Sequence, residues 1–94
     1  MKTDAAEKKA TKIIKEYVDV IVKHNTDGDI KPLALSLSGG KLYEIDKVKF
    51  KCRAASLKVG GTGIRYTVKV KNTVFFLFDE ENGKWFIEKN ILNQ

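Results

Sequence analysis

Several residue types are scarce in this 94-residue chain, and each scarcity limits what the protein can be. A single cysteine, Cys52, cannot form an intramolecular disulfide, so packing alone must hold the fold together. The same scarcity favours a reducing compartment, since small secreted domains usually rely on disulfides. A catalytic triad or a histidine-based metal site would need the only histidine, His24, and nothing in the sequence brings it near Cys52.

Long hydrophobic runs are also missing. No apolar run approaches the roughly 18 residues that a membrane span requires. Residues 1–20 lack the apolar core of a secretion signal, because charged residues interrupt it: Lys8, Lys9, Lys12, Lys15 and Glu16. These features favour a cytoplasmic protein, with an exported protein lacking its leader as the alternative. The length and the 43% hydrophobic content predict a single folded domain over residues 1–94.

Arginine is nearly absent from a basic chain. The formal net charge is +6, and Arg53 and Arg65 are the only arginines among 18 cationic residues, which leaves 16 lysines. A positive balance favours an anionic partner such as nucleic acid or an acidic protein. Proteins that read bases rely on arginine forks, so this composition disfavours a sequence-specific reader.

The C-terminal third carries the clearest structural pattern. Ile64–Lys71, Val74–Phe78 and Lys84–Glu88 are rich in β-branched and aromatic residues, and Asn72-Thr73 and Asn82-Gly83 separate them. This pattern predicts three antiparallel strands. One strand running through Asn72-Thr73 is the alternative. The middle segment is apolar at successive positions, which indicates a central or covered strand.

A further strand is predicted over Leu42–Leu57, with a hairpin loop at Gly60–Gly63. From residue 47 to residue 54, even positions carry apolar residues and odd positions carry cations. A period of two therefore places the first set on a buried face and the second set in solvent. The predicted buried set is Val48, Phe50, Cys52 and Ala54, followed on the next strand by Ile64, Tyr66, Val68 and Val70.

The N-terminal part predicts a helix over Asp4–His24. Asp4 and Glu7 resemble a capping box, and apolar residues recur at spacings of three and four: Ala6, Ala10, Ile13, Tyr17, Ile21 and His24. Asp29–Gly40 reads as a connector in which Pro32 opens a short helical turn. The expected fold class is therefore α+β, with one long N-terminal helix packed on a curved four-stranded antiparallel sheet.

This order of elements resembles the cystatin-like fold, in which a curved antiparallel sheet wraps a helix. Cystatins carry a Gln-x-Val-x-Gly hairpin, and Leu57-Lys58-Val59-Gly60-Gly61 keeps the valine and the last glycine of that motif. Trp85 stands where cystatins have a Pro-Trp hairpin, although the proline is absent. The resemblance implies a cysteine-protease inhibitor that acts through Val59, Gly60, Gly61 and Trp85.

The sequence is also similar to the nuclear-transport-factor-like branch of that fold, through Asn82–Glu88 and Asp27–Leu33. This branch includes noncatalytic accessory domains and small cavity enzymes. An enzyme of this kind would use acid and base groups in a cavity, for which Tyr17, Tyr66, Asp19 and Asp46 are the candidates. Packing in the core explains both tyrosines, which are predicted to point inward.

The remaining motifs predict no catalytic residue, no cofactor and no metal site. Cys52 lies on the apolar face as a buried thiol, and His24 closes the helix. Asn25–Asp29 resembles the start of a calcium loop, but positions six and twelve are Ile30 and Ser36 instead of glycine and glutamate. The Gly60–Gly63 loop lacks the lysine and the helix of a phosphate-binding loop.

The most distinctive polar feature is a predicted cationic sheet face: Lys47, Lys49, Lys51, Arg53, Arg65, Lys69 and Lys71. Such a face binds an anionic partner or is merely solvated. Few exposed aromatics are expected beside it. The sequence therefore predicts a noncatalytic binding or accessory module that meets a protein or other anionic partner through the basic face or the hairpin loops. A nucleic-acid-binding protein and a cystatin-like inhibitor are the alternatives.

Overall fold

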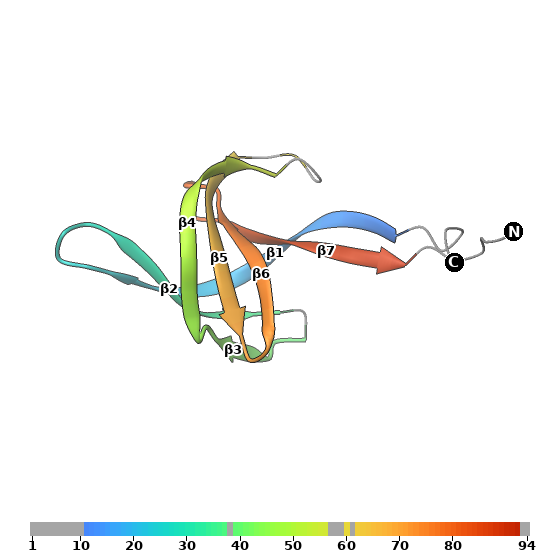
Figure 1. The fold of residues 1–94 in the computed structure, drawn as a ribbon, viewed down its shortest axis with the longest axis horizontal. Coiled ribbons are helices and arrows are strands. Elements are labelled where there is room, and N and C mark those ends of the chain that lie inside the picture. The colour runs from blue at the N-terminus through green and yellow to red at the C-terminus, as the bar shows by residue number, and fades with distance from the viewer. Residues whose placement is uncertain (1–10, 38, 57–59, 61, 93–94) are drawn as a thin grey trace, which may run out of the picture.

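The computed structural model describes residues 11–37, 39–56, 60 and 62–92, and within them the chain forms one antiparallel sheet and no helix (Figure 1). The seven strands are β1 (Thr11–His24), β2 (Ile30–Ser36), β3 (Leu42–Glu44), β4 (Lys47–Ala55), β5 (Thr62–Val70), β6 (Thr73–Asp79) and β7 (Trp85–Leu92). Their order across the sheet is β3-β2-β1-β7-β6-β5-β4. In this part of the chain, no helix is available to cross a membrane.

The predicted helix is wrong, and with it the α+β fold class: β1 occupies Thr11–His24, while residues 4–10 lie outside the description. The side chains of β1 alternate with a period of two. Val18 is buried and Val20 and Val22 are half-buried, whereas Tyr17 and Ile21 are each 51% exposed. β-branched residues at close spacing fit a pleated strand better than a helix, and two neighbouring strands satisfy the backbone.

Strand β1 also changes partner along its length. Thr11–Val18 pairs with β7, and Asp19–His24 pairs with β2. The predicted connector is therefore largely a strand, β2, with Pro32 at a bulge where the register shifts between Ile21 and Val22. A bulge tolerates a residue that cannot donate a ladder hydrogen bond.

The meander predicted in the C-terminal third is confirmed. β5, β6 and β7 are consecutive antiparallel neighbours, and the chain turns at Lys71-Asn72, so the single-strand alternative is wrong. β6 lies between β5 and β7, as its apolar sequence indicates. The predicted long strand Leu42–Leu57 is instead divided into β3 and β4.

That division closes the sheet into a half-barrel. β3 and β4 lie at opposite edges of the sheet, yet only Ile45 and Asp46 separate them in the chain. The Ile45 amide donates to the Leu33 carbonyl of β2 at 2.9 Å, and the Asp46 amide donates to the Lys69 carbonyl of β5 at 2.8 Å. Two residues thus link the two edges, and the sheet must curve (Figure 1).

The remaining seam is joined by side chains. The Tyr66 hydroxyl of β5 donates to the Ile30 carbonyl of β2 at 3.3 Å. Lys51 of β4 contacts Asp29, just before β2, at 2.6 Å. These contacts hold the open edges near each other without a backbone ladder.

The concave side of the half-barrel contains the main core: Val18, Leu35, Tyr66, Val68, Val70, Leu77 and Trp85. A second apolar cluster lies on the outer side of β6 and β7. Phe78 and Phe86 stack there with ring centroids 4.7 Å apart, and they are 1% and 0% exposed. The sheet therefore buries aromatic side chains on both faces.

Candidate binding surface on the outer sheet face

A bulge in β4 changes the predicted alternation. Val48 pairs with Val68, but the register shifts before Phe50, which pairs with Thr67. Cross-strand partners point to the same side of a sheet, so Phe50 lies on the outer face, 59% exposed. The prediction that Phe50 is buried is wrong, whereas the prediction that Val68 is buried is confirmed at 0% exposure.

The bulge also divides the predicted cationic residues. Lys51 pairs with Tyr66 and Arg53 with Ile64, which places both beyond the bulge on the inner side at the edge of the sheet. Both cations have carboxylate partners. Lys51 holds the pKa of Asp29 below its usual value through their hydrogen bond.

Arg53 forms a bidentate ion pair with Glu81, at 2.8 and 3.0 Å. The hydrogen bonds of Arg53 lower the pKa of Glu81 in the same way. Two of the seven predicted cations are thus engaged within the chain, on the side opposite the outer face.

Other cations remain on the outer side of β4 and β5. Lys47 lies directly opposite Lys69, and Lys49 is exposed at the bulge. None of these three lysines has a carboxylate partner among the described residues. Lys71 follows β5, where its amide donates to the Asp46 carboxylate at 2.6 Å and its ammonium lies 5.9 Å from the Tyr43 ring.

Arg65 is built into the outer face more firmly than the lysines. Its guanidinium carbon lies 4.3 Å from the centroid of the Phe76 ring, a cation–π contact. One terminal nitrogen reaches the Cys52 sulfur at 3.7 Å, and the Nε atom is buried without a hydrogen-bond partner. Cys52 is consequently half-buried on the outer face, beside a cation, and not within the inner core.

Exposed apolar side chains lie among these cations. Phe50, Thr67 and Phe76 form one row across β4, β5 and β6, and Phe76 is 38% exposed. Val74, 50% exposed, lies opposite Lys69 in the next row. The expectation of few aromatics beside the cations is therefore wrong. The sequence signal was available in Phe50 and in the apolar run of β6, but only the bulge reveals which face Phe50 takes.

The residues of the inhibitor hypothesis are not seen together on one exposed surface of the described residues. Val59 and Gly61 lie outside the described residues. Gly60 is exposed with a φ of 77°, a conformation that favours glycine. Trp85 is 9% exposed on the inner face, where its ring lies 5.4 Å from that of Tyr66.

The residues of the cavity-enzyme hypothesis are dispersed. Tyr66 points inward as predicted, but Tyr17 points outward and donates to Glu80. Asp46 lies in the link between β3 and β4, and Asp19 is exposed on β1. His24 is exposed at the end of a strand, not of a helix. Within the described residues, no three acidic, histidine or cysteine side chains are grouped as metal ligands.

The outer face of β4, β5 and β6 is thus the surface where the predicted cations and unpredicted aromatics meet. Comparisons of the chain with protein-family models, with curated proteins and with solved structures found no match.

Proposed function

We propose that the protein is a noncatalytic binding module whose outer sheet face binds single-stranded nucleic acid. The observation that supports this most is the row Phe50–Thr67–Phe76, in which both rings are exposed and cations lie on either side. The binding surface comprises these three residues together with Lys47, Lys49, Arg65 and Lys69, and we call it the outer basic face.

The aromatic rings provide the first part of the argument. Bases of an unpaired strand stack on exposed aromatic side chains, with roughly 1–3 kcal/mol per base at stake. Phe50 and Phe76 lie two strands apart, or about 10 Å. Their separation leaves room for bases on either side of Thr67. The Arg65 guanidinium lies over one face of the Phe76 ring, where it fixes that ring and adds a cation beside it.

The lysines provide the second part. Lys47 and Lys69 are cross-strand neighbours of like charge, an arrangement that is unfavourable by itself. A phosphate between them removes the repulsion, and release of counterions from the nucleic acid adds a salt-dependent gain. Within the described part of the chain they have no carboxylate partner, which leaves them available, in contrast to Lys51 and Arg53.

The same composition limits the specificity. One arginine, Arg65, lies on this face, and its guanidinium is already held against Phe76. Base reading by paired donors is therefore a minor contribution, and we expect recognition by stacking and charge. Duplex nucleic acid hides its ring faces and should bind less well than a single strand.

A titration with fluorescein-labelled oligodeoxythymidine tests this proposal through fluorescence anisotropy. We expect Phe50→Ala to weaken binding roughly fivefold to tenfold, because one stacking contact is lost. Leu42→Ala is the matched control, since Leu42 is 52% exposed on β3, away from this face. Lys69→Gln should reduce the slope of log affinity against log salt by about 0.7, and Lys31→Gln should leave it unchanged.

An abasic oligomer of the same length separates stacking from charge. If native protein binds it as tightly as oligodeoxythymidine, the stacking part of the proposal is wrong. Binding that persists unchanged from low to moderate salt, or the complete absence of binding at low salt, contradicts the proposal as a whole.

A further inference from the structure

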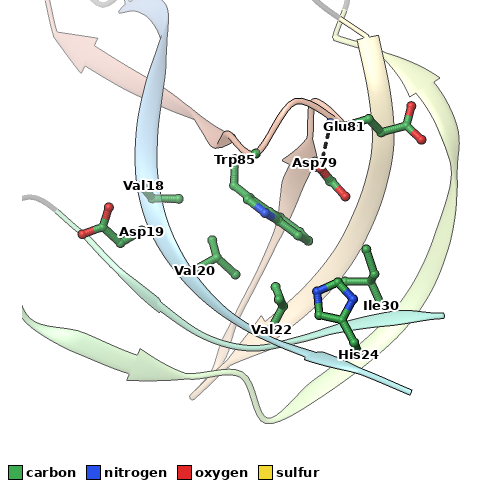
Figure 2. A pocket seen from close by; sticks show the side chains of 10 residues that line it. Val18, Asp19, Val20, Val22, His24, Ile30, Asp79, Glu81 and Trp85 are labelled. Atoms are coloured by element: carbon green, nitrogen blue, oxygen red, sulfur yellow. Dashed lines mark hydrogen bonds between the residues drawn. The ribbon is translucent and has the colours of Figure 1, made fainter. Parts of the chain in front are cut away.

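A second candidate site lies on the concave side of the sheet, opposite the outer basic face. A pocket of about 650 Å³ opens there between β1, the start of β2 and the turn that joins β6 to β7 (Figure 2). This volume is in the range of sites for small molecules. The pocket is present because β1 leaves β7 at Val18 and then pairs only with β2.

One wall of the pocket is apolar. Val18, Val20 and Val22 project from alternate positions of β1, and Figure 2 shows the Trp85 indole facing them across the pocket. Trp85 is 9% exposed, and its indole nitrogen makes no hydrogen bond within the described residues. The indole nitrogen is not fully buried. In the described part of the chain, the one fully buried side-chain atom without a partner is Arg65 Nε. The indole N–H is therefore an unused donor that opens into the pocket.

The polar side chains of the pocket include two carboxylates, Asp79 and Glu81, and one imidazole, His24, in a protein of net charge +6. Asp79 is 7% exposed, and its Oδ1 atom accepts a hydrogen bond of 2.8 Å from the Glu81 amide. No cation pairs with Asp79 within the described residues, whereas Glu81 is neutralised by Arg53. Asp19 lies between Val18 and Val20 on β1, and Figure 2 shows its carboxylate pointing away from the pocket. A carboxylate this buried is unfavourable without a partner of opposite charge.

We propose that this pocket binds a small organic amine with an apolar body. The ammonium group pairs with Asp79, and the apolar body lies between the valines and the Trp85 indole. The aromatic ring favours a cation for a second reason, since its face attracts positive charge. This inference is independent of nucleic-acid binding, because it concerns the opposite face of the sheet.

Trp85 makes the test direct, since it is the only tryptophan in the chain. We would titrate the full chain with phenethylamine, 2-phenylethanol and 3-phenylpropionate, which share an aromatic body and differ in charge, and follow the tryptophan fluorescence. We expect a saturable change with the amine, at least about tenfold tighter than with the carboxylate. Tightest binding of the carboxylate or of the alcohol, or a change that never saturates with the amine, overturns the proposal.

Asp79→Asn should weaken amine binding by about tenfold, because the charge is removed while the shape is kept. Glu44→Gln is the matched control, since it removes the same charge from an exposed position on β3. If Asp79→Asn does not fold, amide chemical shifts of the native protein decide the matter. Amine-induced shifts confined to residues 18–24, Ile30 and residues 79–85 support the site, and shifts elsewhere or none at all refute it.

Discussion

The two faces of the sheet treat aromatic and charged residues differently. On the inner face, Tyr66 and Trp85 pack against aliphatic side chains, the Lys51 ammonium lies 5.5 Å from the Tyr66 ring centroid at the sheet edge, and the buried charge is the carboxylate of Asp79. On the outer face, cations lie against rings: Lys15 is 4.6 Å from the centroid of Phe86, and Arg65 is 4.3 Å from that of Phe76. The side chains of the inner face are buried because the sheet curves around them.

Within the outer face, the contrast continues. Phe78 and Phe86 stack and are sealed, whereas Phe50 and Phe76 remain exposed in a row with Thr67. The two pairs of phenylalanines have the same chemistry but different neighbours. We therefore expect the sealed pair to stabilise the fold and the exposed pair to serve binding. The following substitutions test that division, from the largest expected effect to the smallest.

Phe86→Ala should destabilise the protein by about 3–5 kcal/mol, because it removes a fully buried ring and leaves a cavity beside Phe78. Phe50→Ala should change the free energy of unfolding by less than about 0.5 kcal/mol, since its ring is mostly in solvent. Urea denaturation followed by circular dichroism measures both. Similar losses for the two variants would contradict the division of the outer face into a structural part and a binding part.

Tyr66→Phe tests how the seam of the half-barrel is held on the inner side. The substitution removes the hydroxyl that donates to the Ile30 carbonyl, and it should cost about 1 kcal/mol. Tyr43→Phe is the matched control, because the Tyr43 hydroxyl has no hydrogen bond among the described residues. Hydrogen exchange should show faster opening of the β2 amides near Ile30 in the first variant only. Equal protection in the two variants would show that the seam does not depend on this bond.

The sequence predicted the C-terminal meander but not the N-terminal strand, for a physical reason. In β5 to β7, alternation and turn residues favour the same answer. In β1, Ile13, Tyr17 and Ile21 fit a helical spacing, while Val18, Val20 and Val22 fit a strand. Only the neighbouring strands decide between these two periods, and β2 and β7 come later in the chain.

The sequence predicted the cations of the candidate site but not its exposed aromatic residues. The cations of β4 and β5 are visible in the sequence, but their division between faces depends on a bulge at Lys49. A bulge depends on the register against a partner strand, which no local pattern specifies. The face that each residue of β4 takes from Phe50 to Ala55 follows from it.

Deletion of Lys49 tests this explanation of the two faces. Removing the extra residue leaves Val48 inward and Phe50 outward in a regular alternation, so the cost should be roughly 1 kcal/mol or less. Without a bulge, the deletion would instead shift the remaining side chains of β4 to the wrong face and abolish folding. A cooperative urea transition close to that of the native protein is the expected result. Deletion of Lys47 is the contrasting variant. It removes a paired residue before the bulge and so shifts the start of the strand.

Glu80→Gln should have the smallest effect, about 0.5 kcal/mol at neutral pH. Glu80 accepts a hydrogen bond from Lys15 at 3.0 Å on the outer face, and this bond lowers the pKa of Glu80 below its usual value. A carboxyl group whose pKa is lowered by folding contributes stability above its unfolded pKa and loses it as the pH falls through the folded pKa.

The difference in unfolding free energy between native protein and Glu80→Gln should therefore shrink steadily as the pH falls through the lowered pKa of Glu80 and vanish below it. Urea titrations across that range provide the measurement, with Glu44→Gln as an exposed control that shows no such trend. A constant difference at every pH would mean that Glu80 acts through packing and not through its charge. In that case the cation above Phe86 would be held by the ring alone, and the contrast between the two faces would rest on aromatic contacts without help from ion pairs.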